Sequence, residues 1–358
     1  MNLQTNKPCP DCHAMDESQV DRRGFLQTVG SVASLASMAG LPLLDAVPVA
    51  AAPPTPNSAP ETAVKAFYDS LLPEQRKIIC FDWNHEESKR GILRTRVANN
   101  WQITPPTIDS TFYNKEQKVI LHDIFKGLFN PEWYPKILKQ LKDDTGGKPW
   151  GAGQSVAVFG KPGQGKFEFV MTGRHLTIRA DGNSEDQVAL GGPIFHGHAA
   201  ESFNEKPNHP GNVFWHQALK ANEVFKMLDG KQRQVALVKP TPHEAEVAFR
   251  GDKGAFPGIP VTEMSSDQKA LVEATLNCLI EPYRQEDRDK IMQCLKHQGG
   301  LDKCSLAFYQ DDDLGEDGVW DNWRLEGPSF VWYFRGNPHV HIWINVAMQP
   351  NIKLNADG

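Results

Sequence analysis

Two histidines near the carboxyl end of the chain have the spacing of metal ligands on a β-strand. His339 and His341 lie within the alternating segment PHVHIWINV. Alternate side chains of a strand point to the same face, so the two imidazoles would lie side by side while Val340 and Ile342 face the core. Neutral imidazole is a good ligand for zinc and copper. The pair therefore predicts a metal site that needs at least one further ligand.

Two other segments could supply that ligand. His175 ranks first, because the segment GRHLTIR also alternates and places His175 and Arg179 on one strand face. His196 and His198, in the segment FHGH, form a second His-x-His pair and rank next. Arg174 or Arg179 could orient an anionic substrate through two parallel hydrogen bonds. The alternative is that these histidines only make ordinary hydrogen bonds or lie on the surface.

A glycine-rich segment matches part of a phosphate-binding loop. GKPGQGK, residues 160–166, follows a strand-like segment, but Phe167 stands where such a loop needs Ser or Thr. The residues that follow alternate like a strand, whereas a phosphate site requires a helix there. We therefore expect a hairpin turn and no nucleotide.

The amino-terminal residues contain two competing motifs. CPDCH, residues 9–13, matches the attachment motif of c-type haem. Arg22 and Arg23, a mildly apolar stretch and the small residues 49–52 follow it, and together they resemble a twin-arginine export signal. Haem is attached after export, and CPDCH lies upstream of the arginines. We therefore expect no haem at this motif.

The signal resemblance implies an exported protein. Residues 1–52 would be a twin-arginine signal peptide, with the translocation machinery and signal peptidase as partners, and residues 53–60 a linker. The alternative is a permanent amino-terminal membrane anchor. No later segment is long and apolar enough to span a membrane, so we expect a periplasmic or secreted protein with no stable membrane span after cleavage.

Charge and cysteine content limit the classes of partner. The chain has a formal net charge of −6 and no basic stripe, which predicts no nucleic-acid partner. Four cysteines follow the signal: Cys80, Cys278, Cys294 and Cys304. Disulfides form in oxidising compartments, and Cys294 with Cys304 is the favoured pair. Free or buried thiols are an equal alternative, so the disulfide pairing stays open.

The elements that would position these residues are grouped rather than strictly alternating. This grouping predicts an α+β fold, an antiparallel sheet with helices packed against it. Residues 61–358 would form one domain, helical to about residue 150 and mixed after it. Predicted helical regions are 61–82 with a break at Pro73, 112–143 with a break near Asn130-Pro131, 214–238 and 266–298. Predicted strands are 155–159, 167–171, 175–180, 305–309, 329–335 and 339–346. Residues 191–211 are predicted to be a loop.

One short pattern occurs three times. An apolar residue is followed four positions later by Gln and then a basic residue, at Gln75, Gln232 and Gln268. We interpret the pattern as an ordinary capped helix start. An internal duplication is the alternative, but the match is too short to define a repeat.

Several stretches in order resemble one exported bacterial and fungal family, domain of unknown function 3500. They are Gly173-Arg-His-Leu-Thr177, the Leu228–Arg233 segment, Gly258–Tyr283, Leu325-Glu-Gly-Pro328 and Pro338-His-Val-His341. Together they cover nearly the whole chain after residue 52. The chain departs from the family where Trp343-Ile-Asn-Val follows the His-x-His pair. The resemblance implies export and shared histidines, and it supplies no reaction.

Two functions remain. The first is a metal-dependent enzyme that holds copper or zinc through His175, His339 and His341, with its reaction and substrate unknown. The second is a non-catalytic exported binding or envelope-associated protein whose histidines are structural. Its ligand groove would be built from Trp320, Trp323, Trp332 and Trp343, although these side chains also fit ordinary core and hairpin positions. Convergence of the three imidazoles on one point would favour the first.

Overall fold

A computed structural model describes residues 52–198, 213–314, 318–337 and 339–357. The expected signal peptide, including the CPDCH motif and the two arginines, lies outside these residues, except for residue 52. Contacts join residues 51–358 into one unit. Among the described residues, no helix combines the length and the apolar character that crossing a membrane requires.

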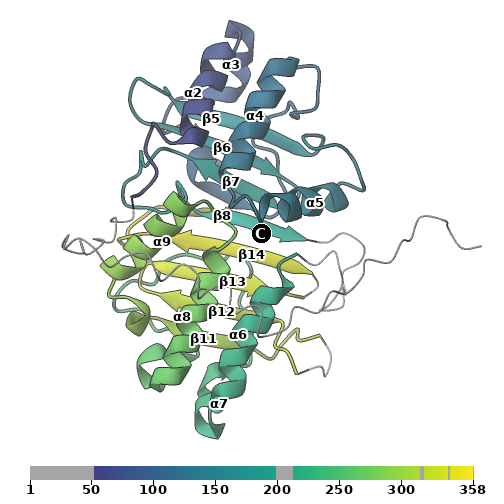
Figure 1. Ribbon diagram of the computed structural model, residues 1–358. Helices are drawn as coiled ribbons and strands as arrows, with labels where there is room; N and C mark the ends of the chain where they lie inside the picture. The colour runs from purple at the N-terminus through teal and green to yellow at the C-terminus, as the bar shows by residue number, and fades with distance from the viewer. Residues whose placement is uncertain (1–51, 199–212, 315–317, 338, 358) are drawn as a thin grey trace, which may run out of the picture. The chain divides into compact units, whose positions relative to one another are not determined.

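The described chain contains eight α-helices and one large sheet of eleven strands, which confirms the α+β class (Figure 1). The helices are α2 (Ala59–Ser70), α3 (Pro73–Ile79), α4 (Lys115–Gly127), α5 (Tyr134–Asp144), α6 (Trp215–Met227), α7 (Gly230–Ala236), α8 (Ser266–Ile280) and α9 (Gln285–His297). The predicted breaks at Pro73 and Asn130-Pro131 are confirmed. Pro73 opens α3 because its missing N–H is not needed in the first turn of a helix.

The strands of the large sheet follow the order β1-β5-β6-β7-β8-β14-β13-β12-β11-β10, and β9 also pairs with β11. Their bounds are β1 (Cys80–Phe81), β5 (Gln154–Gly160), β6 (Phe167–Gly173), β7 (Leu176–Ala180), β8 (Ile194–His198), β9 (Leu237–Val238), β10 (Ile259–Pro260), β11 (Ser305–Tyr309), β12 (Asn322–Gly327), β13 (Phe330–Arg335) and β14 (Val340–Val346). Within this sheet, only β1 and β9 pair in parallel with a neighbour. Two small sheets, β2 (Glu86–Glu87) with β3 (Gly91–Ile92) and β4 (Arg96–Ala98) with β15 (Asn355–Asp357), lie apart from it.

Sequence patterns missed five of these strands: the two-residue strands β1, β9 and β10, of which β1 and β9 end predicted helical regions, and the longer strands β8 and β12. β8 contains His196 and His198 and was expected to be a loop, because Gly191, Gly192 and Gly197 break its apolar pattern. β12 was not predicted, although Asn322-Trp-Arg-Leu-Glu326 alternates between polar and apolar residues as a strand does. The hairpin at residues 160–166 is confirmed: it joins antiparallel β5 and β6. Gly160 has φ +69°, and a Cβ there would lie 2.2 Å from the Lys166 carbonyl oxygen.

The helices cover one face of the large sheet, and irregular segments cover the other. Side chains of β5, β6, β13 and β14 join the helices in the main core, among them Val156, Phe169, Trp332 and Ile342. The alternate side chains point to the opposite face. There they contact residues 81–103 in one cluster and residues 238–249 in another. Because both faces are covered, strand positions on each side are buried.

The same structural unit occurs twice in the fold. Two helices, a short strand, two helices and four strands occur in that order in α2–β8 and again in α6–β14; the short strands β2, β3 and β4 are added in the first unit and β10 in the second. The strand order is symmetric about the central pair β8 and β14, and the parallel pair β1–β5 has its counterpart in β9–β11. The registers also agree, since Ala157 lies opposite Val170 and Ala307 lies opposite Arg324. The fold is therefore an internal structural duplication.

The three-fold Gln pattern is explained by this duplication. Gln75 and Gln117 exchange amide hydrogen bonds of 3.0 and 2.9 Å, and Gln232 and Gln268 do the same at 3.0 and 2.7 Å. Gln117, Gln232 and Gln268 also close capping boxes at their helix starts, and Gln75 accepts from the Leu72 N–H at the start of α3. The interpretation of the Gln pattern as capped helix starts is correct. Setting an internal duplication aside was wrong, because the Gln residues form pairs at equivalent places in the two units.

The four cysteines of the described chain are free thiols, so the favoured Cys294–Cys304 disulfide is wrong. Cys294 and Cys304 are buried, and Cys80 and Cys278 are partly buried. Burial raises the pKa of Cys80 and Cys304 to about 12 and that of Cys278 and Cys294 to about 11. The thiols therefore stay protonated and unreactive at neutral pH.

We expect the glutamine pair of the first unit to be energetically coupled. Gln75→Ala or Gln117→Ala leaves a buried amide without its partner and should lower the free energy of unfolding by about 1–3 kcal/mol. The double variant should lose less than the sum, by about 0.5–3 kcal/mol, in denaturant unfolding. The Gln232/Gln268 pair is the matched control and should show coupling of the same sign. Strict additivity in both pairs would contradict this account.

We expect all four thiols to react with a thiol reagent only after unfolding. A chain that begins at Pro53 should react slowly at pH 8 in its native state, because burial keeps the thiolate fraction small. In denaturant without reductant, all four cysteines should react at once. Two cysteines that stay unreactive until reductant is added would show a disulfide.

Candidate metal centre

The side chains of strand β14 alternate between the two faces of the sheet, as the sequence pattern predicts. Val340 and Ile342 enter the core beneath the helices, whereas Trp343 lies in the cluster on the opposite face. His341 shares the face of Trp343, and His339 immediately precedes the strand. The exposed fractions of His339 and His341 are only 8% and 6%.

His175 reaches the same place from a tight turn. It follows Arg174 in the two-residue connection between β6 and β7, and its φ is +53°. Its N–H donates to the Asn99 carbonyl at 3.0 Å, and its own carbonyl accepts from Gly197 at 3.2 Å. A non-glycine residue in this region is strained, although His is among the more tolerant types. Strain of this kind is typical of functional positions.

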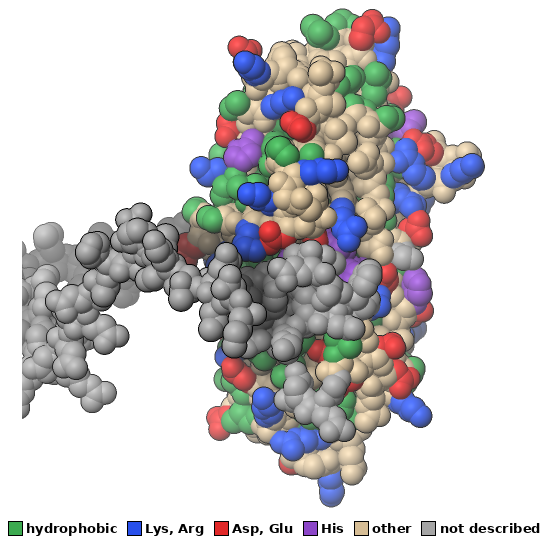
Figure 2. Space-filling view, turned by 90° about the vertical axis from the view of Figure 1, so that its right-hand side faces the viewer, with side chains coloured by type: hydrophobic (Ala, Val, Ile, Leu, Met, Phe, Trp, Pro, Cys, Tyr) green, Lys and Arg blue, Asp and Glu red, His purple; other side chains and the backbone are tan. Residues whose placement is uncertain are grey.

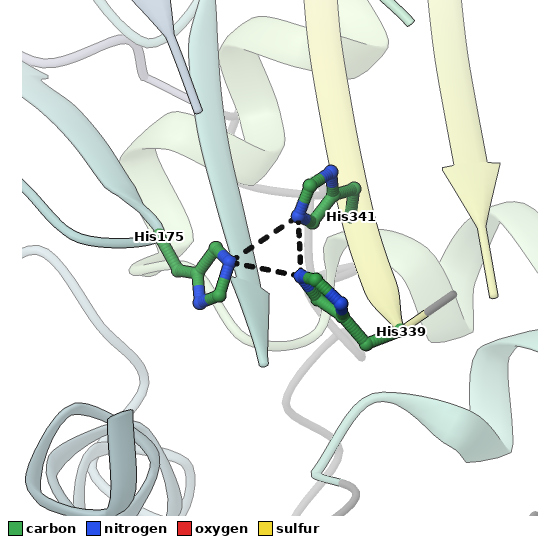
Figure 3. Close-up of side chains that lie close together, drawn as sticks. All are labelled: His175, His339 and His341. Carbon is green, nitrogen blue, oxygen red and sulfur yellow. Dashed lines mark hydrogen bonds between the residues drawn. The ribbon is translucent and has the colours of Figure 1, made fainter. Parts of the chain in front are cut away.

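The three imidazoles converge on one point (Figure 3). The Nε2 atom of His175 lies 3.1 Å from that of His339 and 3.2 Å from that of His341, and the last two are 2.8 Å apart. Zinc–nitrogen bonds of 2.0–2.1 Å in tetrahedral geometry place ligand nitrogens about 3.3 Å apart. The observed separations are within a few tenths of an ångström of that spacing, so a metal ion fits with a small outward shift.

Carboxylates contact the far nitrogens of two of these rings. The Nδ1 atom of His341 lies 2.5 Å from a Glu244 oxygen, and the Nδ1 atom of His175 lies 3.1 Å from an Asp144 oxygen. A carboxylate in this position holds the proton on Nδ1 and leaves the Nε2 lone pair free to bind a metal. Asn99 also donates to Glu244 at 2.9 Å, and Arg335 forms an ion pair with it at 2.9 Å. These contacts fix both the tautomer and the orientation of the rings.

The surroundings keep His339 and His341 neutral and Glu244 charged. Burial, together with the neighbouring His341 and His175, lowers the pKa of His339 to about 3. Burial also lowers the pKa of His341, against the opposing effect of Glu244. Burial favours the protonated form of Glu244, but its hydrogen bond and charge interaction with His341 outweigh that and bring its pKa to about 2. The Nε2 lone pairs of His339 and His341 therefore face each other at neutral pH, an arrangement that a cation would stabilise.

Gly197 makes room for the three rings. It lies opposite His341 in the β8–β14 ladder. A Cβ at Gly197 would lie 2.5 Å from the Val340 carbonyl oxygen, 3.0 Å from Cδ2 of His341 and 3.4 Å from Cδ2 of His175. The equivalent position in the second unit is Ala347, whose N–H donates to Ser329 as Gly197 donates to His175. A side chain is thus tolerated where no imidazoles converge.

The second-tier histidines lie elsewhere. His196 and His198 alternate with Gly197 on β8, so their side chains point to the helix-covered face, away from His341. His196 contacts the Phe214 ring, and its Nδ1 lies 3.3 Å from the Tyr283 hydroxyl. Burial lowers the pKa of His196 to about 3. The structure therefore separates both residues from the converging group.

The two candidate arginines differ in what they can reach. Arg179 is buried, with its guanidinium 2.8 Å from Glu168 and donating to the Pro193 and Arg96 carbonyls at 2.8 and 2.6 Å. These partners hold Arg179 as a structural residue. Arg174 is exposed on the turn beside His175, so it remains available to a substrate.

Sequence patterns did not identify Asp144, Glu244 or Gly197 as part of this centre. Asp144 ends α5, and Glu244 lies in an irregular segment 97 residues before His341. Neither has a local signal that ties it to a histidine. The segment FHGH did carry a signal, but its glycine, not its histidines, contributes to the centre.

Comparison with known proteins identifies a family and nothing more specific. No curated protein matches the chain, and no solved structure matches it. One family model, described as a protein of unknown function (DUF3500), matches residues 55–345. This range contains His175, His339, His341 and both carboxylates. The chain therefore belongs to the DUF3500 family.

Proposed function

We propose that this protein is a metal-dependent enzyme that holds one zinc or copper ion through His175, His339 and His341. The convergence of three Nε2 atoms within 3.2 Å carries the proposal. The three residues come from two segments far apart in the chain, and burying their lone pairs against one another without a cation would be unfavourable. Three imidazoles suit either metal, and no thiolate of the described chain joins the group.

A metal held by three histidines keeps a coordination position open, where a bound zinc or copper ion supplies a Lewis acid. The protein's own residues would do the rest. Glu244 and Asp144 hold the ligand rings in place. Arg174 and Arg335 both place positive charge near His339, and Arg174 is exposed. We infer that they favour an anionic substrate at the open position.

The alternative of a tryptophan-lined ligand groove receives less support. Trp323, Trp332 and Trp343 are fully buried, and Trp320 is partly buried against the core. Such side chains pack the interior and offer no face to a ligand. The four tryptophans therefore do not form the ligand groove that this alternative predicts.

Export remains part of the proposal. A twin-arginine signal in residues 1–52 would take the folded chain, with its metal in place, to the periplasm or the exterior. A site assembled from both structural units needs the folded chain, which is consistent with such a route. On the face shown in Figure 2, the described acidic and basic side chains are interspersed, which gives no support to a nucleic-acid partner.

We expect the purified protein to contain about one equivalent of zinc or copper. His339→Ala or His341→Ala should remove nearly all of it, as measured by elemental analysis after dialysis. His122→Ala is the control, because His122 contacts Tyr134 on the helix side and should leave the metal content unchanged. Protein without either metal, after growth with both supplied, would contradict the proposal.

We expect His175→Asn to separate metal binding from folding. Asn accepts a positive φ at least as well as His, so the metal-free variant should unfold at the same denaturant concentration or a slightly higher one. Its metal affinity should fall at least about tenfold, because one of three ligands is lost. Competition with a chelator measures the affinity, and unfolding in EDTA measures the stability. A variant that is unstable but retains the metal would show that His175 is structural.

A further inference from the structure

A second site lies on the same face of the sheet, where β12 carries a buried arginine without hydrogen bonds. Arg324 is 1% exposed, and none of its three guanidinium nitrogens has a hydrogen-bond partner in the described structure. Its nearest carboxylate oxygen, on Glu326, is 3.6 Å away, too far for a hydrogen bond. The guanidinium also lies 4.4 Å from the centre of the Tyr333 ring. Buried cations are normally hydrogen-bonded, so this one calls for an explanation.

A cavity of about 520 Å³ is lined by Tyr309, which shares a sheet face with Arg324 on the neighbouring strand; Arg324 itself is not among the lining residues. Tyr309 lines the cavity, is 1% exposed and has a hydroxyl without a hydrogen-bond partner among the described residues. Tyr309 lies on β11, the strand that pairs with β12, and on the same face as Arg324. The other walls are largely apolar and include Pro240, Pro242 and Phe256. The volume is that of a small-molecule site.

The charges around the Tyr309 hydroxyl are mixed. Arg250 lines the cavity and donates to Glu326 at 2.8 Å, which leaves Glu326 shared between Arg250 and Arg324. Glu246 also lines the cavity and is exposed. One carboxylate thus serves two guanidinium groups at the buried end. That end has the excess of donors that an anionic group would satisfy.

The first structural unit shows that the fold does not need these polar groups. Val170 lies opposite Ala157, as Arg324 lies opposite Ala307. Phe159 follows Ala157 by two residues, as Tyr309 follows Ala307. Both Val170 and Phe159 are buried in an apolar cluster. The same architecture is therefore stable with an apolar pair where the second unit has an arginine and a phenol.

We propose that the cavity binds a small aromatic carboxylic acid. Its carboxylate would accept hydrogen bonds from Arg324 and from the Tyr309 hydroxyl, and its ring would lie against the prolines and Phe256. Burial raises the pKa of Tyr309 to about 12 although Arg324 lowers it, so the phenol keeps its proton to donate. This proposal does not rest on the metal centre.

Calorimetric titration of metal-free protein tests the proposal. The probes are benzoate, phenylacetate and 3-phenylpropionate, each compared with its amide, and the absence of metal prevents binding at the histidines. At least one acid should bind with a Kd of about 1 mM or tighter, and its amide at least about tenfold more weakly. Arg324→Val should weaken that acid at least about tenfold, and Tyr309→Phe by about threefold or more.

Stability provides a second readout. Arg324→Val copies the residue found in the first unit, so without ligand it should unfold at the same denaturant concentration or a higher one. Arg288→Met, at a separate cavity beside Tyr283, is the control and should leave acid binding unchanged. The proposal is overturned if no acid binds better than its amide. It is also overturned if Tyr309→Phe and Arg324→Val both bind the acids as tightly as the unmodified protein does. If Arg324→Val does not fold, unchanged acid binding by Tyr309→Phe is enough to overturn the proposal.

Discussion

The pairing of β8 with β14 is the interaction on which the rest of the structure depends. It joins two similar units into one sheet, and its register places His341 opposite Gly197. A slip of one residue would turn every side chain of β14 to the other face and move the imidazole of His341 beneath the helices. The converging histidines need both units, because His175 belongs to the first and His339 and His341 to the second. The β8–β14 ladder therefore determines both the continuity of the large sheet and the position of the candidate metal centre.

Buried charge reinforces this junction. Arg284, at the start of α9, donates to Glu61 of α2 at 2.8 and 2.7 Å and to Asp287 at 2.8 Å. The contact joins a helix of the first unit to a helix of the second. A buried ion pair adds little net stability, but breaking it leaves an unpaired charge. Its contribution is therefore mainly to specify which surfaces of the two units meet.

Local sequence signals predicted what depends on local physics. Alternation in β14 correctly gave the shared face of His341 and Trp343, and prolines gave the helix breaks, because both follow from backbone geometry within a few residues. His175 could be ranked first as the third ligand, but His196 and His198 could not be excluded. No local sequence pattern shows which strand lies beside another in the sheet. Asp144 and Glu244 escaped prediction for the same reason. The duplication was visible only as three glutamines, because an apolar core tolerates many substitutions whereas a paired amide does not.

The duplication also separates what the fold requires from what it merely permits. Two units with one topology face the same packing problem, so a polar residue in one that replaces an apolar or small residue in the other is not needed for folding. His175 occupies the turn position of Ser329, and Gly197 that of Ala347. Arg324 and Tyr309 occupy the positions of Val170 and Phe159. Each difference lies on the face away from the helices. That face carries the candidate chemistry of both sites, and the helix-covered face carries the stability.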